Sequence, residues 1–115
     1  MAKLYFRYGA MNSGKSTAII QVAHNYEERG MHVLLVKPEV DTKGNDAVIS
    51  RLGVQRHVDM LIGRHDNVTA RFHQYVIEHG TIECILVDEA QFLPPSQIDE
   101  LYRIAVHENI PVICY

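Results

Sequence analysis

The stretch Gly9-Ala10-Met11-Asn12-Ser13-Gly14-Lys15-Ser16 decides the fold of this 115-residue chain. It fits the pattern G-x-x-x-x-G-K-[ST], a glycine-rich loop whose backbone N–H groups surround phosphate. The pattern requires a strand before the loop and a helix after it. Residues 4–8 form a mainly apolar run, and residues 15–29 carry apolar side chains at helical spacing before Gly30. This context favours a phosphate-binding loop over the alternative, a glycine turn that happens to precede a helix.

The rest of the chain alternates short apolar runs with amphipathic segments, which is typical of βα units around a mostly parallel sheet. Strands are predicted over residues 32–37, 83–87 and 110–115, and helices over residues 67–79 and 95–108. Residues 39–53 are polar and are interpreted as a loop, and residues 52–62 contain a further short strand. We therefore predict an α/β fold over residues 1–115, a P-loop nucleotide-binding domain with a RecA-like, mostly parallel sheet flanked by helices.

Composition and charge exclude several classes of protein. Hydrophobic residues make up 47% and charged residues 22%, which is near the globular averages and excludes a disordered chain. The 11 basic and 14 acidic side chains give a net charge of −3 without a basic run, so a nucleic-acid partner is not expected. No apolar stretch approaches the roughly 18–20 residues that span a bilayer, and we expect a cytoplasmic protein with no membrane partner. Cys84 and Cys114 lie in apolar runs, where buried, unreactive thiols are expected.

The loop and the first turn of the following helix predict a site for ATP. Lys15 would reach the β- and γ-phosphates, the Ser16 hydroxyl would ligate Mg²⁺, and Thr17 would lie near the α-phosphate. The partial positive charge of the helix N-terminus adds to the attraction for phosphate. The predicted nucleotide-binding residues of this segment are Gly9, Ala10, Met11, Asn12, Ser13, Gly14, Lys15, Ser16 and Thr17.

An acidic pair, Asp88 and Glu89, follows the apolar run at residues 83–87. Asp88 would hold Mg²⁺ through its water shell, because ligands gather at the carboxyl ends of strands in α/β sheets. Glu89 would act as the general base, the catalytic residue of the site. The alternatives are a solvated pair at the end of a strand, or the same two roles exchanged. The pair by itself does not separate a kinase from a RecA-like or helicase-type ATPase.

The residues around the acidic pair narrow the choice. The segment Asp88-Glu89-Ala90-Gln91-Phe92 resembles the D-E-x-Q-F signature of the type II thymidine kinases, a family of cellular and bacterial enzymes. The resemblance runs from one end of the chain to the other. It also includes residues 8–17, 25–31 and 110–115.

The resemblance implies a kinase that transfers the γ-phosphoryl group of ATP to the 5′-hydroxyl of thymidine, with ATP and Mg²⁺ as its cofactors. Glu89 would be the proton acceptor and Asp88 would lie on the magnesium side. Ala90 and Gln91 would complete the nucleotide site, and Phe92 would contact the thymine base. The family also implies a homo-oligomer, namely a tetramer.

Two departures from the family pattern are visible. The family places an aspartate and an arginine near the phosphates, and the corresponding residues here are Asp41 and Lys43; lysine lacks the bidentate fork of arginine. Arg51, further along the loop, is a candidate to take the place of that arginine, and the alternative for all three residues is a solvated loop. Family members also continue into a zinc-binding segment and a lasso-like loop that closes over the nucleoside. We therefore expect a chain truncated before that segment, without zinc in these residues and with poor turnover of thymidine by itself; the alternative is a small domain that ends naturally at its last strand.

Three further expectations complete the interpretation. A RecA-like or helicase-type ATPase fragment and a non-catalytic nucleotide-binding module remain as alternative functions. The seven histidines show no metal-ligand spacing and are expected at the surface. Four aromatic residues at helical spacing are expected in the core: Tyr26, Phe72, Tyr75 and Tyr102.

Overall fold

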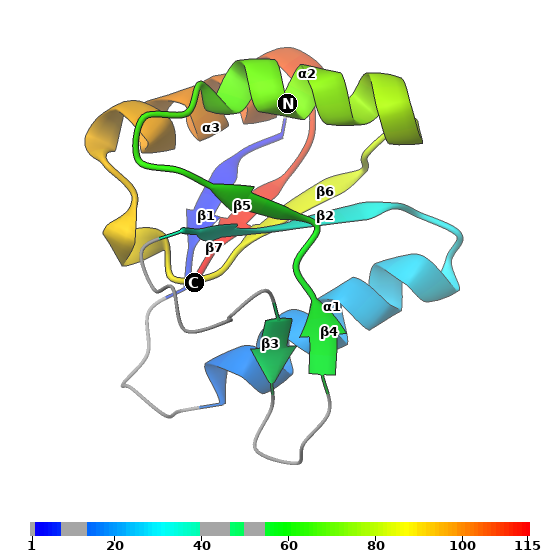
Figure 1. Cartoon of the computed structure of the whole chain (residues 1–115). Coiled ribbons are helices and arrows are strands. Elements are labelled where there is room, and N and C mark those ends of the chain that lie inside the picture. Colours follow the sequence, from blue (N-terminus) through cyan, green and yellow to red (C-terminus); the bar gives the residue numbers. More distant parts are fainter. Residues whose placement is uncertain (1, 8–13, 40–46, 50–54) are drawn as a thin grey trace.

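The computed structural model describes residues 2–7, 14–39, 47–49 and 55–115 (Figure 1). Within these ranges a five-stranded sheet has the strand order β1-β7-β6-β2-β5, and every neighbouring pair in it is parallel. Its strands are β1 (Leu4–Phe6), β2 (Val33–Pro38), β5 (Met60–Ile62), β6 (Cys84–Val87) and β7 (Val112–Cys114). The helices are α1 (Lys15–Glu28), α2 (Val68–His79), α3 (Pro95–Glu108) and the short 3₁₀ helix η1 (Ala90–Phe92). The predicted α/β fold with a mostly parallel sheet and flanking helices is confirmed.

The helices form a layer on each side of the sheet. Figure 1 shows α1 on one face, and α2 and α3 side by side on the other. Successive residues of a strand point to opposite faces, so Leu35 packs in the core on the α1 side and Leu34 packs in the core under α2 and α3. All four residues of β6 are buried. Strands covered on both faces are continuous apolar runs, which explains the pattern of the sequence.

The structure corrects two predictions. Part of the expected loop at residues 39–53 is the strand β3 (Ala47–Ile49), which pairs antiparallel with β4 (Gln55–His57). Val48 of β3 is 2% exposed and packs on the α1 side, so tertiary burial and not local pattern selects this strand. The second error is Tyr102, which was expected in the core but is 53% exposed, because the buried stripe of α3 passes through its neighbours Leu101 and Ala105.

The other elements lie close to their predicted bounds. The helix predicted over residues 67–79 begins one residue later, because Asn67 is its N-cap and accepts a hydrogen bond from the Ala70 N–H at 2.9 Å. Glu100 of α3 also accepts a hydrogen bond from the Val68 N–H at 3.0 Å, which fixes the start of α2 against α3. All seven histidines are exposed, as expected. In the part of the chain that the structure describes, no helix is long and apolar enough to cross a membrane.

The two cysteines are fully buried, and burial raises the pKa of the Cys84 thiol to about 11 and that of the Cys114 thiol to about 12. Only the thiolate reacts with alkylating agents, so both thiols should resist iodoacetamide at pH 8 in the folded protein. Intact mass after a timed reaction measures this, with the denatured protein as the control in which both thiols react. Rapid alkylation of either thiol under native conditions would contradict the burial.

Candidate active site

Three strands bring the candidate site residues to one edge of the sheet. The strands β1, β2 and β6 run parallel, so their carboxyl ends share the edge at which α1 begins (Figure 1). Gly14 precedes α1 with φ +87°, a left-handed conformation that side chains other than glycine rarely adopt. The helix then begins at Lys15, so its free N–H groups face this edge.

Lys15 contacts both members of the acidic pair. Its Nζ lies 2.5 Å from Glu89 Oε1 and 3.4 Å from Asp88 Oδ1. Burial alone would lower the pKa of Lys15, but the hydrogen bond to Glu89 and the charges of Asp88 and Glu89 outweigh it and raise this pKa. Lys15, in the described end of the predicted phosphate-binding motif, and the acidic pair are therefore on the same side of the sheet, within contact distance, as one site requires.

Asp88 is a buried carboxylate held by its own backbone and its neighbours. It is 4% exposed, and its N–H donates to Val36 O at 2.9 Å, which continues the ladder between β6 and β2. Asp88 Oδ1 also accepts a hydrogen bond from the Glu89 N–H at 3.0 Å. A buried carboxylate is costly unless it is paired, so the contact with Lys15 and the hydrogen bond from the Glu89 N–H stabilise Asp88 there.

Glu89 directs its carboxylate differently from Asp88, because the backbone turns at this residue. Glu89 has φ 56°, in the left-handed region that costs energy for residues other than glycine, and such strain clusters at functional sites. The residue after the turn holds it in place, because the Ala90 N–H donates to Tyr115 O at 3.0 Å. Gln91 Nε2 donates to Glu89 Oε2 at 2.6 Å, so one oxygen of Glu89 is held by Gln91 and the other by Lys15.

Phe92 is a large apolar side chain that is 54% exposed at the end of η1. Its N–H donates to Glu89 O at 3.1 Å, which ties its position to that of the carboxylate. The next residue, Leu93, is buried and anchors the segment to the core under α2 and α3. An exposed aromatic ring on an anchored turn beside the carboxylates has the geometry of a surface on which a planar ring could stack.

The donor set fits Mg²⁺ in its chemistry. This cation prefers oxygen ligands and keeps several waters, and it is usually bound by one or two carboxylates together with substrate phosphates. The Ser16 hydroxyl in the first turn of α1 and the buried Asp88 carboxylate supply such oxygens at the same edge of the sheet.

Lys37 is a site residue that was not expected from the sequence. It lies in β2 with a side chain only 12% exposed, and its Nζ is 4.0 Å from Asp88 Oδ2. The available signal was one basic residue near the carboxyl end of an otherwise apolar run. That signal becomes meaningful only when the strand order places β2 beside β6.

Several predicted site residues lie outside the described residues: Gly9, Ala10, Met11, Asn12, Ser13, Asp41, Lys43 and Arg51. Their proposed roles therefore stay predictions. The structure brings together Lys15, Asp88, Glu89 and Gln91 through the contacts described above.

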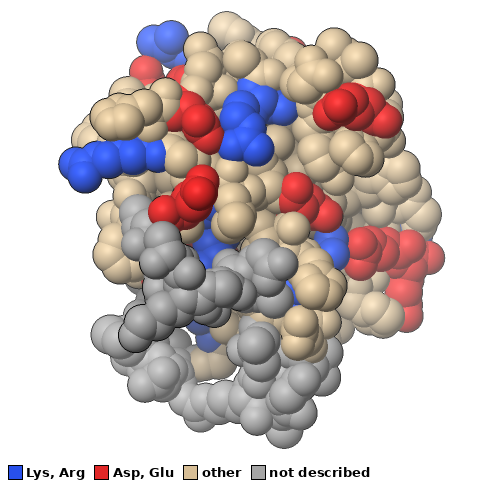
Figure 2. Space-filling model, viewed as in Figure 1, with Lys and Arg blue, Asp and Glu red and all other residues tan. Residues whose placement is uncertain are grey.

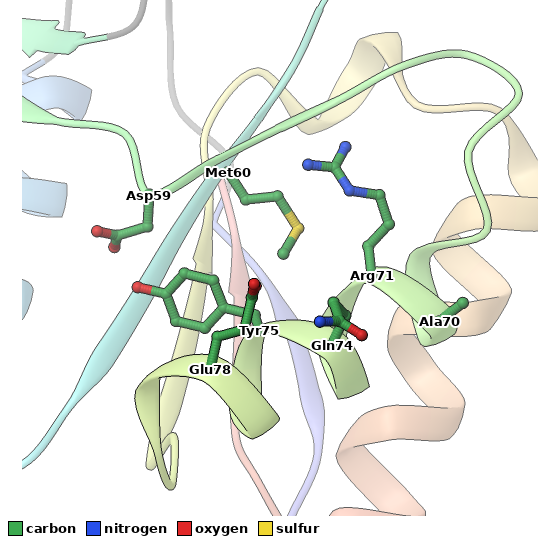
Figure 3. Close-up of a pocket in the computed structure, with 7 residues that line it drawn as sticks. All are labelled: Asp59, Met60, Ala70, Arg71, Gln74, Tyr75 and Glu78. Atoms are coloured by element: carbon green, nitrogen blue, oxygen red, sulfur yellow. The ribbon is translucent and has the colours of Figure 1, made fainter.

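A separate hollow of about 460 Å³ lies between α2 and the edge strand β5 (Figure 3). Arg71 lines this hollow, and its guanidinium group already has partners, because Nη1 donates to Leu61 O at 2.5 Å and to Asp66 Oδ2 at 2.7 Å. The hollow is lined by Asp59, Met60, Ala70, Arg71, Gln74, Tyr75 and Glu78. None of these belongs to the predicted site.

Comparison with known proteins identifies a family for the chain. The family model described as thymidine kinase matches residues 2–115. The chain belongs to the thymidine kinase family. It is 49% identical to a thymidine kinase of Idiomarina loihiensis, 42% to one of Xanthomonas campestris and 41% to one of Enterobacteria phage T4. All of this chain is covered in each comparison, with 59%, 55% and 59% of the respective relative.

The chain thus spans between 55% and 59% of the length of these thymidine kinases. The match to the family includes the acidic pair and all described elements of the parallel sheet, since it begins at residue 2 and continues to residue 115.

Proposed function

We propose that this chain carries the ATP site and the general base of a thymidine kinase, which transfers the γ-phosphoryl group of ATP to the 5′-hydroxyl of thymidine. The observation that carries the proposal is the contact of Lys15 with both Asp88 and Glu89. It joins the phosphate-binding motif to a carboxylate pair, the combination that phosphoryl transfer needs. Membership of the thymidine kinase family supports thymidine as the acceptor.

The residues divide the work of the reaction. Lys15, one-third exposed and at the start of α1, moves from Glu89 to the β- and γ-phosphates when the triphosphate binds. This movement frees Glu89 Oε1 to accept the proton of the attacking hydroxyl. Ser16 and Asp88 would hold Mg²⁺, which would supply positive charge that neutralises the phosphates. Gln91 keeps the Glu89 carboxylate oriented through its other oxygen.

The direct test uses the full-length protein, ATP and thymidine, with product nucleotide measured by chromatography. The proposal expects thymidine monophosphate and ADP in equal amounts. ATP hydrolysis that is stimulated by nucleic acid, without phosphorylation of thymidine, would support the ATPase alternative. Figure 2 shows basic and acidic side chains interspersed over the described part of the visible face, which is not the basic stripe of a nucleic-acid-binding motor.

Phe92→Ala tests the proposed contact with the thymine base. Stacking of a base on an aromatic ring is worth about 1–3 kcal/mol, so KM for thymidine should rise about 5- to 150-fold while the ATP dissociation constant stays unchanged. Tyr102→Ala is the matched control, because Tyr102 is an aromatic residue of α3 with the same degree of exposure, 53% against 54%. An unchanged KM for thymidine in Phe92→Ala would remove Phe92 from the acceptor site.

We also propose that ATP and Mg²⁺ are the cofactors, that zinc is not held by these residues, and that the full-length protein is a homo-oligomer, namely a tetramer. The oxygen donors Ser16 and Asp88 support the magnesium part. Light scattering of the full-length protein tests the oligomer, and elemental analysis tests for zinc.

A further inference from the structure

Lys37 has a fixed place beside Asp88. Val36 pairs with Val87 in the ladder of β2 and β6, so the residues that follow, Lys37 and Asp88, are neighbours across the two strands. The other edge of β2 pairs with β5, where Lys37 is in register with Leu61. The backbone of Lys37 is therefore held from both sides of the strand.

The side chains of Lys37 and Asp88 point to the same face of the sheet. Residues two apart in a strand share a face, and Leu35 and Leu86 both pack in the core on the α1 side. Lys37 and Asp88 thus face the side where α1 begins, which is the side of Lys15. Neighbours in register on parallel strands share a face, which agrees with the 4.0 Å between Lys37 Nζ and Asp88 Oδ2.

The two lysines contact different oxygens of the same carboxylate. Lys15 approaches Asp88 Oδ1 at 3.4 Å, whereas Lys37 approaches Oδ2. Their settings differ, because the side chain of Lys15 is 33% exposed at the start of a helix and that of Lys37 is 12% exposed in an interior strand. An ammonium group with so little access to water needs a charged partner, and Asp88 is the partner that the structure places there.

When a triphosphate binds, Lys15 moves from Asp88 and Glu89 to the phosphates. Once Lys15 moves to the phosphates, the buried carboxylate of Asp88 would lose its closer partner and would repel the incoming anion. We propose that Lys37 is a positioning residue, which keeps the Asp88 carboxylate balanced and in place so that Lys15 is free to move to the triphosphate. This inference rests on the proposed function of the site, and it assigns Lys37 a role through Asp88, without direct contact with the nucleotide.

Lys37→Met tests the inference, because methionine preserves length and removes the charge. The measurement is the ATP dissociation constant of the full-length protein by calorimetry in EDTA, without divalent cations. The constant should rise at least about fivefold, since Asp88 then retains Lys15 and repels ATP. Lys37→Arg should restore affinity close to that of the parent protein. Lys3→Met is the control, because Lys3 is an exposed lysine outside the site.

A double-variant cycle with Asp88→Asn separates action through Asp88 from direct contact with phosphate. When Asp88 carries no charge, Lys37→Met should lose most of its effect, and the double variant should bind ATP more tightly than Lys37→Met alone. An effect of the same size in both backgrounds would show direct phosphate contact and overturn the inference. An unchanged ATP affinity in Lys37→Met would overturn it as well.

Two measurements keep the test decisive. Thermal melting without ATP identifies a folding defect. If Lys37→Met does not fold, Lys37→Gln replaces it, alone and combined with Asp88→Asn. Phosphorylation of thymidine by the parent protein is measured separately. If the cycle behaves as expected and thymidine is not phosphorylated, the inference on Lys37 stands and the proposed acceptor is wrong.

Discussion

Glu89→Gln should lower kcat for thymidine phosphorylation by about 10²–10⁴-fold, the contribution typical of a general base. Glutamine keeps the size of the side chain but does not accept a proton. ATP binding should be retained or become tighter, because the partner 2.5 Å from Lys15 loses the negative charge that competes with the phosphates. Steady-state kinetics with both substrates, together with ATP calorimetry, measures the two effects.

The control for this substitution is Glu108→Gln, an exposed glutamate at the end of α3 that should change neither quantity. Full activity of Glu89→Gln would favour the hypothesis of a non-catalytic nucleotide-binding module. A loss of activity that is accompanied by an equal loss of ATP affinity would instead assign Glu89 to nucleotide binding and not to proton transfer.

Lys15→Met should abolish useful ATP binding. Truncation of one partner of a hydrogen-bonded charge pair costs about 2–5 kcal/mol, which predicts a dissociation constant about 30- to 5,000-fold higher. The variant also leaves Asp88 and Glu89 without the Lys15 ammonium, so their charges repel the triphosphate. Calorimetry in the presence of Mg²⁺ measures the change, and circular dichroism checks that α1 is still formed.

Lys3→Met again serves as the matched control, since it removes the same charge from an exposed position away from the site. ATP affinity of Lys15→Met within a factor of about three of the parent value would contradict the phosphate-binding role, because that corresponds to less than about 1 kcal/mol. Lys15→Met and Glu89→Gln therefore separate the functions of the two residues, because the first should lose ATP binding and the second should lose turnover.

Much of the fold could be predicted from local signals. The helix over residues 95–108 has the predicted bounds, because Pro95 occupies its first position and Asn109 ends it in a left-handed conformation. The strands β3, β4 and β5 have three residues each, which is too short for periodicity to resolve. The strand β5 depends on its pairing with the distant strand β2, and β3 depends on the burial of Val48 on the α1 side, so the local pattern does not contain this information.

Some residues of the candidate site could likewise be predicted from the sequence, and others could not. Lys15, Asp88 and Glu89 could be found because their motifs have fixed spacings that phosphate and metal chemistry impose. Lys37 could not, because its importance depends on β2 lying next to β6 with Val36 opposite Val87. The left-handed backbone conformation of Glu89 could not be predicted either, because glutamate carries no sequence signal for that conformation.

The position of β7 between β1 and β6 has a consequence for how the protein acquires activity. Leu4 pairs with Val112, so the first strand joins the sheet only after the chain has been synthesised through β7. Sheets that depend on such long-range pairing fold slowly, and their early intermediates lack the pocket that a ligand could stabilise. Nucleotide can therefore protect the folded protein from unfolding, but it cannot assist the nascent chain before β7 has docked.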